Sequence, residues 1–295
     1  MKVFVTGANG QLGFDLTQEL LKRGHKVTAS DISDTPVSDC EYIKLDITDE
    51  RAVSEAITKA APDAVIHCAA WTAVDAAEDN ENREKVLAVN AKATEYIAKA
   101  CKSIDAKMVY LSTDYVFGGE GEEPWQADDK NFAPLNFYGE TKLMGEKAVS
   151  ETLEKYFIVR ISWVFGRNGN NFVKTMLKVG KNHDTVRVVN DQIGTPTYTP
   201  DLSVLLCSMI ETDKYGFYHA SNEGGYISWY DFTKEIYRQA GYSTNVLPVT
   251  TEEYGLSKAK RPHNSRLDKS KLSAGGFTSL PDWKDALSRY LKENI

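Results

Sequence analysis

The hydrophobic pattern of the chain changes near residue 165. Before it, short apolar, β-branched runs alternate with segments whose apolar positions recur at helical spacing. Several runs are apolar throughout, which is typical of strands covered on both faces. The predicted strands are Lys2 to Thr6, Lys26 to Ser30, Tyr42 to Leu45, Ala64 to His67, Lys107 to Ser112 and Tyr156 to Ile161. The predicted helices include Gln11 to Arg23, Glu50 to Ala60, Arg83 to Lys102 and Phe137 to Lys155.

This alternation predicts an α/β fold, a Rossmann-type doubly wound parallel sheet with helices on both faces. A closed eight-fold barrel needs more repeats than the chain supplies. Beyond residue 165 the order is no longer strand then helix, and further helices are predicted over 201–211, 228–239 and 282–293. We therefore expect a cofactor-binding domain over 1–165 and a smaller, mainly helical substrate-binding lobe over 166–295, part of which could rejoin the first domain.

Composition narrows the classes of function. With 35 basic and 42 acidic residues, the net charge of −7 disfavours nucleic acid or an anionic membrane as a partner. No run of about 18 apolar residues and no secretory signal is present, so a cytoplasmic protein is expected. The cysteines at 40, 68, 101 and 207 and the histidines at 25, 67, 183, 219 and 263 lack ligand spacing. Buried thiols and no metal site of this kind are predicted.

A glycine-rich loop follows the first predicted strand directly. Gly7, Gly10 and Gly13 stand between that strand and an amphipathic helix. Glycine lets the chain turn tightly and lets a pyrophosphate approach the N–H groups at the positive end of the helix. A plain strand-to-helix turn is the alternative, but the strand, glycines and helix within one βαβ unit favour a dinucleotide site.

Two acidic residues follow the next two strands. Asp31, 18 residues past Gly13, is placed to accept hydrogen bonds from the ribose hydroxyls of the cofactor. It would repel a 2′-phosphate, so NADH is mildly preferred over NADPH. A solvated turn is the alternative for Asp31. Asp46, with Ile47, is expected near the adenine, although an aspartate there could equally cap the helix near Glu50.

A tyrosine and a lysine lie four residues apart at the start of a predicted helix. Tyr138 and Lys142 therefore share one helix face. A fixed cation favours the phenolate, which makes proton exchange near neutral pH easier. A surface pair is the common alternative. The polar run at 112–115 and the run at 69–72 end two strands at the same predicted sheet edge, and this favours a site for carbonyl reduction.

The sequence resembles the extended short-chain dehydrogenase/reductases, and closely the dTDP-4-dehydrorhamnose reductase family, over nearly its whole length. The residues that carry the resemblance are the runs at 5–13, 68–78, 112–117, 134–142, 160–166 and 191–197. It implies reduction of dTDP-4-dehydro-L-rhamnose to dTDP-L-rhamnose by hydride transfer from NADH or NADPH.

The resemblance also implies roles for individual residues. Tyr138 would donate the proton, Lys142 would hold the nicotinamide ribose and lower the tyrosine pKa, and Thr113 would hydrogen-bond the sugar carbonyl. Asp114 and Trp163 would contact the nucleotide-sugar, unless Asp114 only caps its loop and Trp163 is a core residue. The residues that would line the dinucleotide are Gly7, Gly10, Gln11, Leu12, Gly13, Asp31, Asp46, Ile47, Ala69, Ala70, Trp71 and Thr72, with Tyr138 and Lys142.

Outside this set, Asn90 is expected to steady the sheet near the site, and Arg261 matches a basic element near the pyrophosphate. Some family members bind Mg²⁺ through glutamates near the first helix, where this chain has Asp15 and Glu19. This departure leaves open both a need for Mg²⁺ and the choice between monomer and homodimer. Alternative functions are a nucleotide-sugar epimerase or dehydratase that retains NAD, and a non-catalytic subunit like the regulatory subunit of methionine adenosyltransferase.

Overall fold

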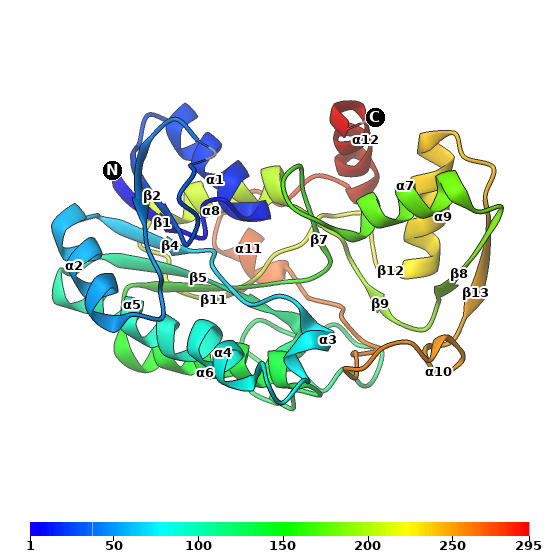
Figure 1. Cartoon of the computed structure of the whole chain (residues 1–295), viewed down its shortest axis with the longest axis horizontal. Coiled ribbons are helices and arrows are strands. Elements are labelled where there is room, and N and C mark those ends of the chain that lie inside the picture. The colour runs from blue at the N-terminus through cyan, green and yellow to red at the C-terminus, as the bar shows by residue number, and fades with distance from the viewer. Residues whose placement is uncertain (37, 295) are drawn as a thin grey trace.

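Seven parallel strands form the central sheet of the computed structural model, which describes residues 1–36 and 38–294 (Figure 1). Their order is β11-β6-β5-β4-β1-β2-β3. The strands are β1 (Lys2–Thr6), β2 (Lys26–Asp31), β3 (Glu41–Lys44), β4 (Ala64–His67), β5 (Lys107–Thr113), β6 (Tyr156–Ile161) and β11 (Gly216–His219). The order reverses at β1, so the predicted doubly wound sheet is confirmed.

Helices cover both faces of the sheet. One face carries α1 (Gln11–Lys22), α8 (Thr199–Ile210) and the short α11 (Ser270–Ala274), and the other carries α2 (Glu50–Ala60), α5 (Ala93–Ser103) and α6 (Phe137–Thr152) (Figure 1). Gly24, with a φ of 78°, follows the end of α1. Because the inner strands are buried between two helical layers, their apolar runs show no alternation.

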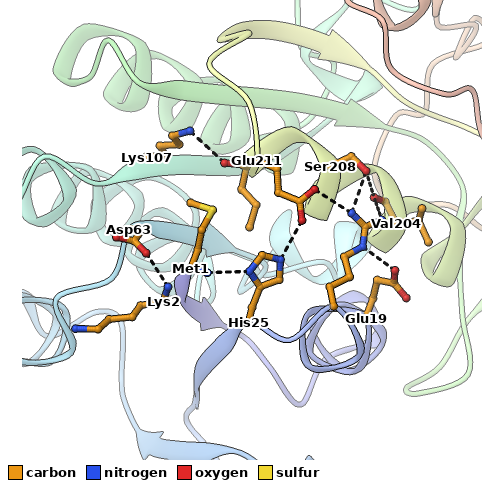
Figure 2. A network of polar contacts seen from close by, with 11 residues as sticks. Met1, Lys2, Glu19, His25, Asp63, Lys107, Val204, Ser208 and Glu211 are labelled. Atoms are coloured by element: carbon orange, nitrogen blue, oxygen red, sulfur yellow. Dashed lines mark hydrogen bonds and ion pairs between the residues drawn. The ribbon is translucent and has the colours of Figure 1, made fainter.

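Segments beyond residue 165, namely β11, α8 and α11, belong to this sheet domain. The edge strand β11 pairs with β6, and α8 packs against α1. Figure 2 shows a polar network at the far ends of these helices, where His25 contacts the amino group of Met1 at 3.3 Å and the carboxylate of Glu211 at 3.1 Å. Arg23 donates to Ser208 at 3.1 Å in the same network. The sequence predicted a domain boundary at residue 165 and allowed part of the later chain to rejoin the first domain. The segments β11 and α8 lie beyond residue 165 and pack with the central sheet and its helices.

The C-terminal lobe contains more strand than the sequence predicted. Its helices α7 (Phe172–Asn182), α9 (Trp229–Ala240), α10 (Thr251–Tyr254) and α12 (Trp283–Asn294) accompany the parallel pair β8 (Thr185–Val189) and β13 (Asn245–Val249). Two further short pairs are β7 (Val164–Phe165) with β10 (Thr197–Tyr198), and β9 (Ile193–Gly194) with β12 (Ile227–Ser228). The core of the lobe contains many aromatic residues. Among the residues that the structure describes, no helix is long and apolar enough to cross a membrane.

The single helix predicted over 83–102 is interrupted. The structure has α3 (Val74–Ala77) and α4 (Arg83–Leu87), then a π-helical turn over 88–92 before α5. Periodicity did not reveal the interruption because helical backbone continues through the turn, which only widens by one residue. This π-helical turn contains the buried Asn90.

The buried-thiol prediction is correct for two of the four cysteines. Cys101 and Cys207 are buried, whereas Cys40 and Cys68 are partly exposed, and all four are free. Burial raises the pKa of the Cys68, Cys101 and Cys207 thiols to about 12.

A buried ion pair fixes α6 on the sheet. Arg160 of β6 donates two hydrogen bonds of 2.8 Å to the Glu146 carboxylate of α6. Both side chains are 2% exposed or less. Further Arg160 contacts are the Ala127 carbonyl at 3.1 Å and the Phe117 ring at 4.9 Å.

Replacing Arg160 with Met should lower the free energy of unfolding by about 3 to 5 kcal/mol, because it leaves the Glu146 carboxylate buried and unpaired. Urea denaturation measures the change. The matched control is Arg51→Met, which breaks an exposed i, i+4 pair with Glu55 and should leave the midpoint almost unchanged. Equal midpoints for both variants would contradict a stabilising role for the buried pair.

Candidate active site

The glycine loop is built for close approach to another backbone. Gly7 has a φ of 66°, and a Cβ there would lie 2.5 Å from the backbone nitrogen of Ala69. A Cβ on Gly13 would lie 2.1 Å from the Gly7 carbonyl oxygen. Gly10 is the N-cap of α1 and provides no side-chain cap, so the first N–H groups of the helix lack side-chain partners there. This arrangement fits a pyrophosphate at the helix N-terminus.

The other residues predicted around the dinucleotide lie at the same sheet edge. Asp31 ends β2, and its carboxylate accepts a hydrogen bond of 3.1 Å from the Asn9 backbone. The Leu12 side chain is a core residue, which leaves only its backbone to the site. Gln11 instead accepts a hydrogen bond of 2.9 Å from Asn171, so the glycine loop contacts the start of α7.

The alternative interpretation of Asp46 as a helix cap is wrong. Asp49 caps α2 by accepting from the Ala52 backbone at 3.0 Å. Asp46 is exposed and accepts from the hydroxyl of Thr48 at 2.7 Å, while Ile47 is buried. The capping residue, Asp49, lies three residues closer to α2 than Asp46 does. The sequence spacing did not distinguish these two aspartates.

The loop after β4 is held by Asn90. This side chain accepts from the Trp71 backbone N–H at 2.8 Å and donates to the Trp71 carbonyl at 3.2 Å. It also donates to the Thr141 hydroxyl of α6 at 3.2 Å. Asn90 therefore joins the 69–72 loop to the helix that contains Tyr138 and Lys142, which is consistent with the supporting role expected for it. Ala69, Ala70 and Trp71 are half-buried and Thr72 is exposed.

Thr113, Asp114 and Tyr138 meet in one polar cluster. The Thr113 hydroxyl donates to Asp114 at 3.1 Å and accepts from the Tyr115 backbone at 3.2 Å. It also influences the pKa of the nearby Tyr138 phenol. Thr113, not Asp114, thus caps the short turn that follows β5. Burial raises the pKa of Asp114 to about 6, against the opposing hydroxyls of Ser265 and Thr113.

The environment of Tyr138 favours the protonated form of its phenol. Burial, followed by the charge of Asp114, raises the pKa of its phenol well above the usual range, while the Thr113 hydroxyl opposes the rise. The expected lowering by Lys142 is not the dominant effect. Lys142 is itself buried, and burial lowers the pKa of its ammonium to about 7 despite the opposing charge of Glu146.

Trp163 bridges the two parts of the chain in a strained conformation. Its φ of 49° is unusual for a residue with a bulky side chain. Its half-buried ring stacks on Trp229 of the lobe, with 3.7 Å between centroids. Backbone strain of this kind gathers at binding sites, so the conformation of Trp163 is compatible with the predicted contact to the nucleotide-sugar, which stays a prediction.

Arg261 lies against the sheet domain through Asp75. Its guanidinium donates to both Asp75 oxygens, at 2.6 and 3.1 Å. The same carboxylate accepts from the backbone of Lys258 and Ala259 at 3.0 Å. The 258–265 segment is thereby fastened over the start of α6, where Asn136 also donates to the Lys260 carbonyl at 2.7 Å.

The two acidic residues weighed as magnesium ligands already have partners. Asp15 is buried and accepts from Arg167 at 2.7 Å and from Thr199 at 2.5 Å. Glu19 pairs with Arg23 at 2.9 Å. Within residues 1–36 and 38–294, no group of three or more possible ligands is arranged for a metal ion.

Several residues of the site were missed by sequence analysis. Ser265 reaches Asp114 from 151 residues away, and Tyr110 lies beneath Lys142. Neither has a local motif that marks it, because each is brought in by sheet order or by chain return. The lone signal was the Arg261-Pro262 pair, which indicated that this segment approaches the site.

The doubly wound sheet, the uncapped glycine loop and the Tyr138–Lys142 helix define an NAD(P)H-dependent oxidoreductase of the short-chain dehydrogenase/reductase class. The RmlD substrate binding domain family matches residues 1–295. The chain belongs to this family, which includes the dTDP-4-dehydrorhamnose reductases.

Named relatives align over almost the whole chain. The Bacillus subtilis spore coat polysaccharide biosynthesis protein SpsK is 39% identical over 99% of this chain and 97% of its own. The dTDP-4-dehydrorhamnose reductase of Shigella flexneri is 38% identical over 99% and 98%. The crystal structure of dTDP-4-dehydrorhamnose reductase from Bacillus anthracis in complex with NADP has a TM-score of 0.91 and 42% identity, with 99% of each chain covered.

Replacing Gly13 with Ala should weaken dinucleotide binding at least about tenfold, because the new Cβ would displace the Gly7 carbonyl and with it the loop. Titration of NADPH fluorescence measures the affinity. The control is Gly24→Ala at the other end of α1, where φ is 78° but a Cβ meets nothing within 4 Å. That variant should lose stability and keep its affinity, and a Gly13 variant that binds normally would place the dinucleotide elsewhere.

Proposed function

We propose that this chain reduces the 4-keto group of dTDP-4-dehydro-L-rhamnose with hydride from a reduced nicotinamide dinucleotide, forming dTDP-L-rhamnose. The observation that carries the proposal is the placement of Thr113, at the end of β5, with Tyr138 and Lys142, on one face of α6, at the sheet edge that holds the glycine loop. The identity of the substrate is inferred from relatives named as dTDP-4-dehydrorhamnose reductases.

In this proposal the residues of the chain act on protons and on orientation. The cofactor, when bound, supplies the hydride. The Tyr138 phenol donates its proton to the new alkoxide, and a hydroxyl of Thr113 stabilises the oxygen as charge develops. Lys142 holds the ribose and, once its ammonium is charged, stabilises the phenolate left behind. Asp114 and Trp163 contact the nucleotide-sugar. The cytoplasmic location expected from the sequence stays a prediction.

The decisive assay mixes the purified chain with the keto sugar nucleotide and reduced cofactor. One equivalent of cofactor should be oxidised for each sugar reduced, followed at 340 nm and by product chromatography. An epimerase or dehydratase would convert sugar without net oxidation, and a non-catalytic subunit would do neither. Either of those results would remove the reductase proposal.

The Tyr138→Phe variant should lose turnover by about 10²- to 10⁴-fold, because the proton donor is absent while the ring still packs. Cofactor affinity should change little. Tyr237→Phe provides the control, since it removes a buried phenol hydroxyl in the core of the lobe, far from this cluster in the fold. Unchanged turnover in Tyr138→Phe would require a different proton donor.

Asp31 is proposed to favour NADH over NADPH. Replacing it with Ala should raise kcat/KM for NADPH relative to NADH by about tenfold, because a carboxylate near the ribose repels a 2′-phosphate. Measuring both cofactors with both proteins gives the ratio. Asp34→Ala, which removes an exposed carboxylate paired with Lys44 in the same region, is the control. An equal ratio in wild type and Asp31→Ala would separate Asp31 from the ribose.

A further inference from the structure

The buried ammonium of Lys142 rests on an aromatic face. The side chain of Lys142 is 3% exposed, and its Nζ lies 4.1 Å from the centroid of the Tyr110 ring. In the part of the chain that the structure describes, this ammonium makes no hydrogen bond of its own. Removing an ammonium from water is costly, so a charge held there needs a compensating interaction. The negative face of an aromatic ring supplies one.

The Tyr110 ring is held firmly in this position. It lies on β5 with no exposed surface, and its hydroxyl donates to the Lys142 carbonyl at 3.2 Å. The ring lies 5.8 Å from that of His67, nearly parallel to it. Opposite the hydroxyl is Gly145, where a Cβ would come within 2.2 Å of the phenol oxygen. A glycine at that position of α6 therefore lets the helix descend until Lys142 reaches the ring.

We infer that Tyr110 is a positioning residue for the catalytic pair, whose ring face holds the Lys142 ammonium beside the dinucleotide and stabilises its charge. The inference rests on the proposed function, because the charge matters to turnover only if Lys142 assists Tyr138. The hydroxyl of Tyr110 has the separate task of bonding to the α6 backbone. The two parts of the side chain can therefore be tested independently.

The other groups around Lys142 do not replace this contact. Glu146 lies one turn further along α6, but its carboxylate is already bound by Arg160. The Cys68 thiol and the Tyr138 phenol stay protonated at neutral pH, because burial raises the pKa of each. His67 on β4 is uncharged, since burial and then Lys142 lower its pKa to about 3. The aromatic face is the neighbour that meets the ammonium directly.

The test replaces Tyr110 with phenylalanine and then with 4-fluoro-, 3,4,5-trifluoro- and pentafluorophenylalanine. Size and shape change little along this series, while the negative charge on the ring face falls stepwise. The pKa of Lys142 is read from the [ε-¹³C]lysine NMR spectrum of the full chain, with the resonance assigned by its loss in Lys142→Met. The pH profile of kcat/KM is measured in parallel.

Phenylalanine should keep the pKa of Lys142 close to the wild-type value, because the ring face remains. Across the fluorinated series that pKa should fall by roughly one unit in total, a tenfold change in the protonation equilibrium. The loss of activity on the alkaline side should then move to lower pH by a similar amount, because less of the ammonium is charged at a given pH.

A pKa that is constant across the series, or a fall as large in the phenylalanine variant as in the pentafluoro variant, would overturn the inference. A graded pKa with no turnover in any form, wild type included, would support the ring contact and reject the proposed reaction. Circular dichroism and thermal melting of each variant confirm that the compared chains are folded.

Discussion

The depth at which α6 packs on the sheet determines the geometry of the candidate site. Tyr138, Lys142 and Glu146 follow one another at four-residue spacing, so all three turn toward the sheet. Burying two ionisable groups on one helix face is unfavourable unless each finds a partner. Arg160 binds the Glu146 carboxylate, and the ring of Tyr110 faces the Lys142 ammonium. The ion pair therefore acts as an anchor whose position is transmitted along the helix to the phenol.

The start of the same helix is fixed by segments that are distant in sequence. Asn136 caps α6 by accepting from the Gly139 backbone at 2.8 Å, and its amide donates to Lys260. The Phe137 backbone donates to Glu78 at 2.7 Å, next to the helix whose Asp75 holds Arg261. Because the lobe returns to this point, the piece of chain that closes the site also sets the position of Tyr138. Catalytic geometry and lobe placement are thus coupled through hydrogen bonds rather than through a hinge.

The sheet could be predicted from sequence because its strands are continuous apolar runs and its loops carry glycine. All six strands expected before residue 165 form, and their boundaries differ from the predicted ones by at most one residue, as in β3. The seventh, β11 (Gly216–His219), begins with a glycine and lies beyond the regular alternation of strands and helices, so it produced no comparable signal. The π-helical turn was also not predicted. Helical spacing does not show that the Asn90 side chain contacts a loop 19 residues earlier. Contacts made by chain return have no periodicity to detect.

The cluster at the end of β5 has fewer protons than possible acceptors. Thr113 has one hydroxyl proton, and it points to Asp114 in this form. If the same hydroxyl is to stabilise a carbonyl oxygen, a bound sugar must compete with that carboxylate. The competition is set by the charge of Asp114, whose pKa of about 6 lies close to physiological pH because burial disfavours the charged form. A protonated Asp114 would release Thr113 and could itself donate to the sugar, whereas a charged Asp114 holds the hydroxyl back. In the proposed reaction, burial of this carboxyl therefore favours the protonated state in which the Thr113 hydroxyl is released to the sugar oxygen.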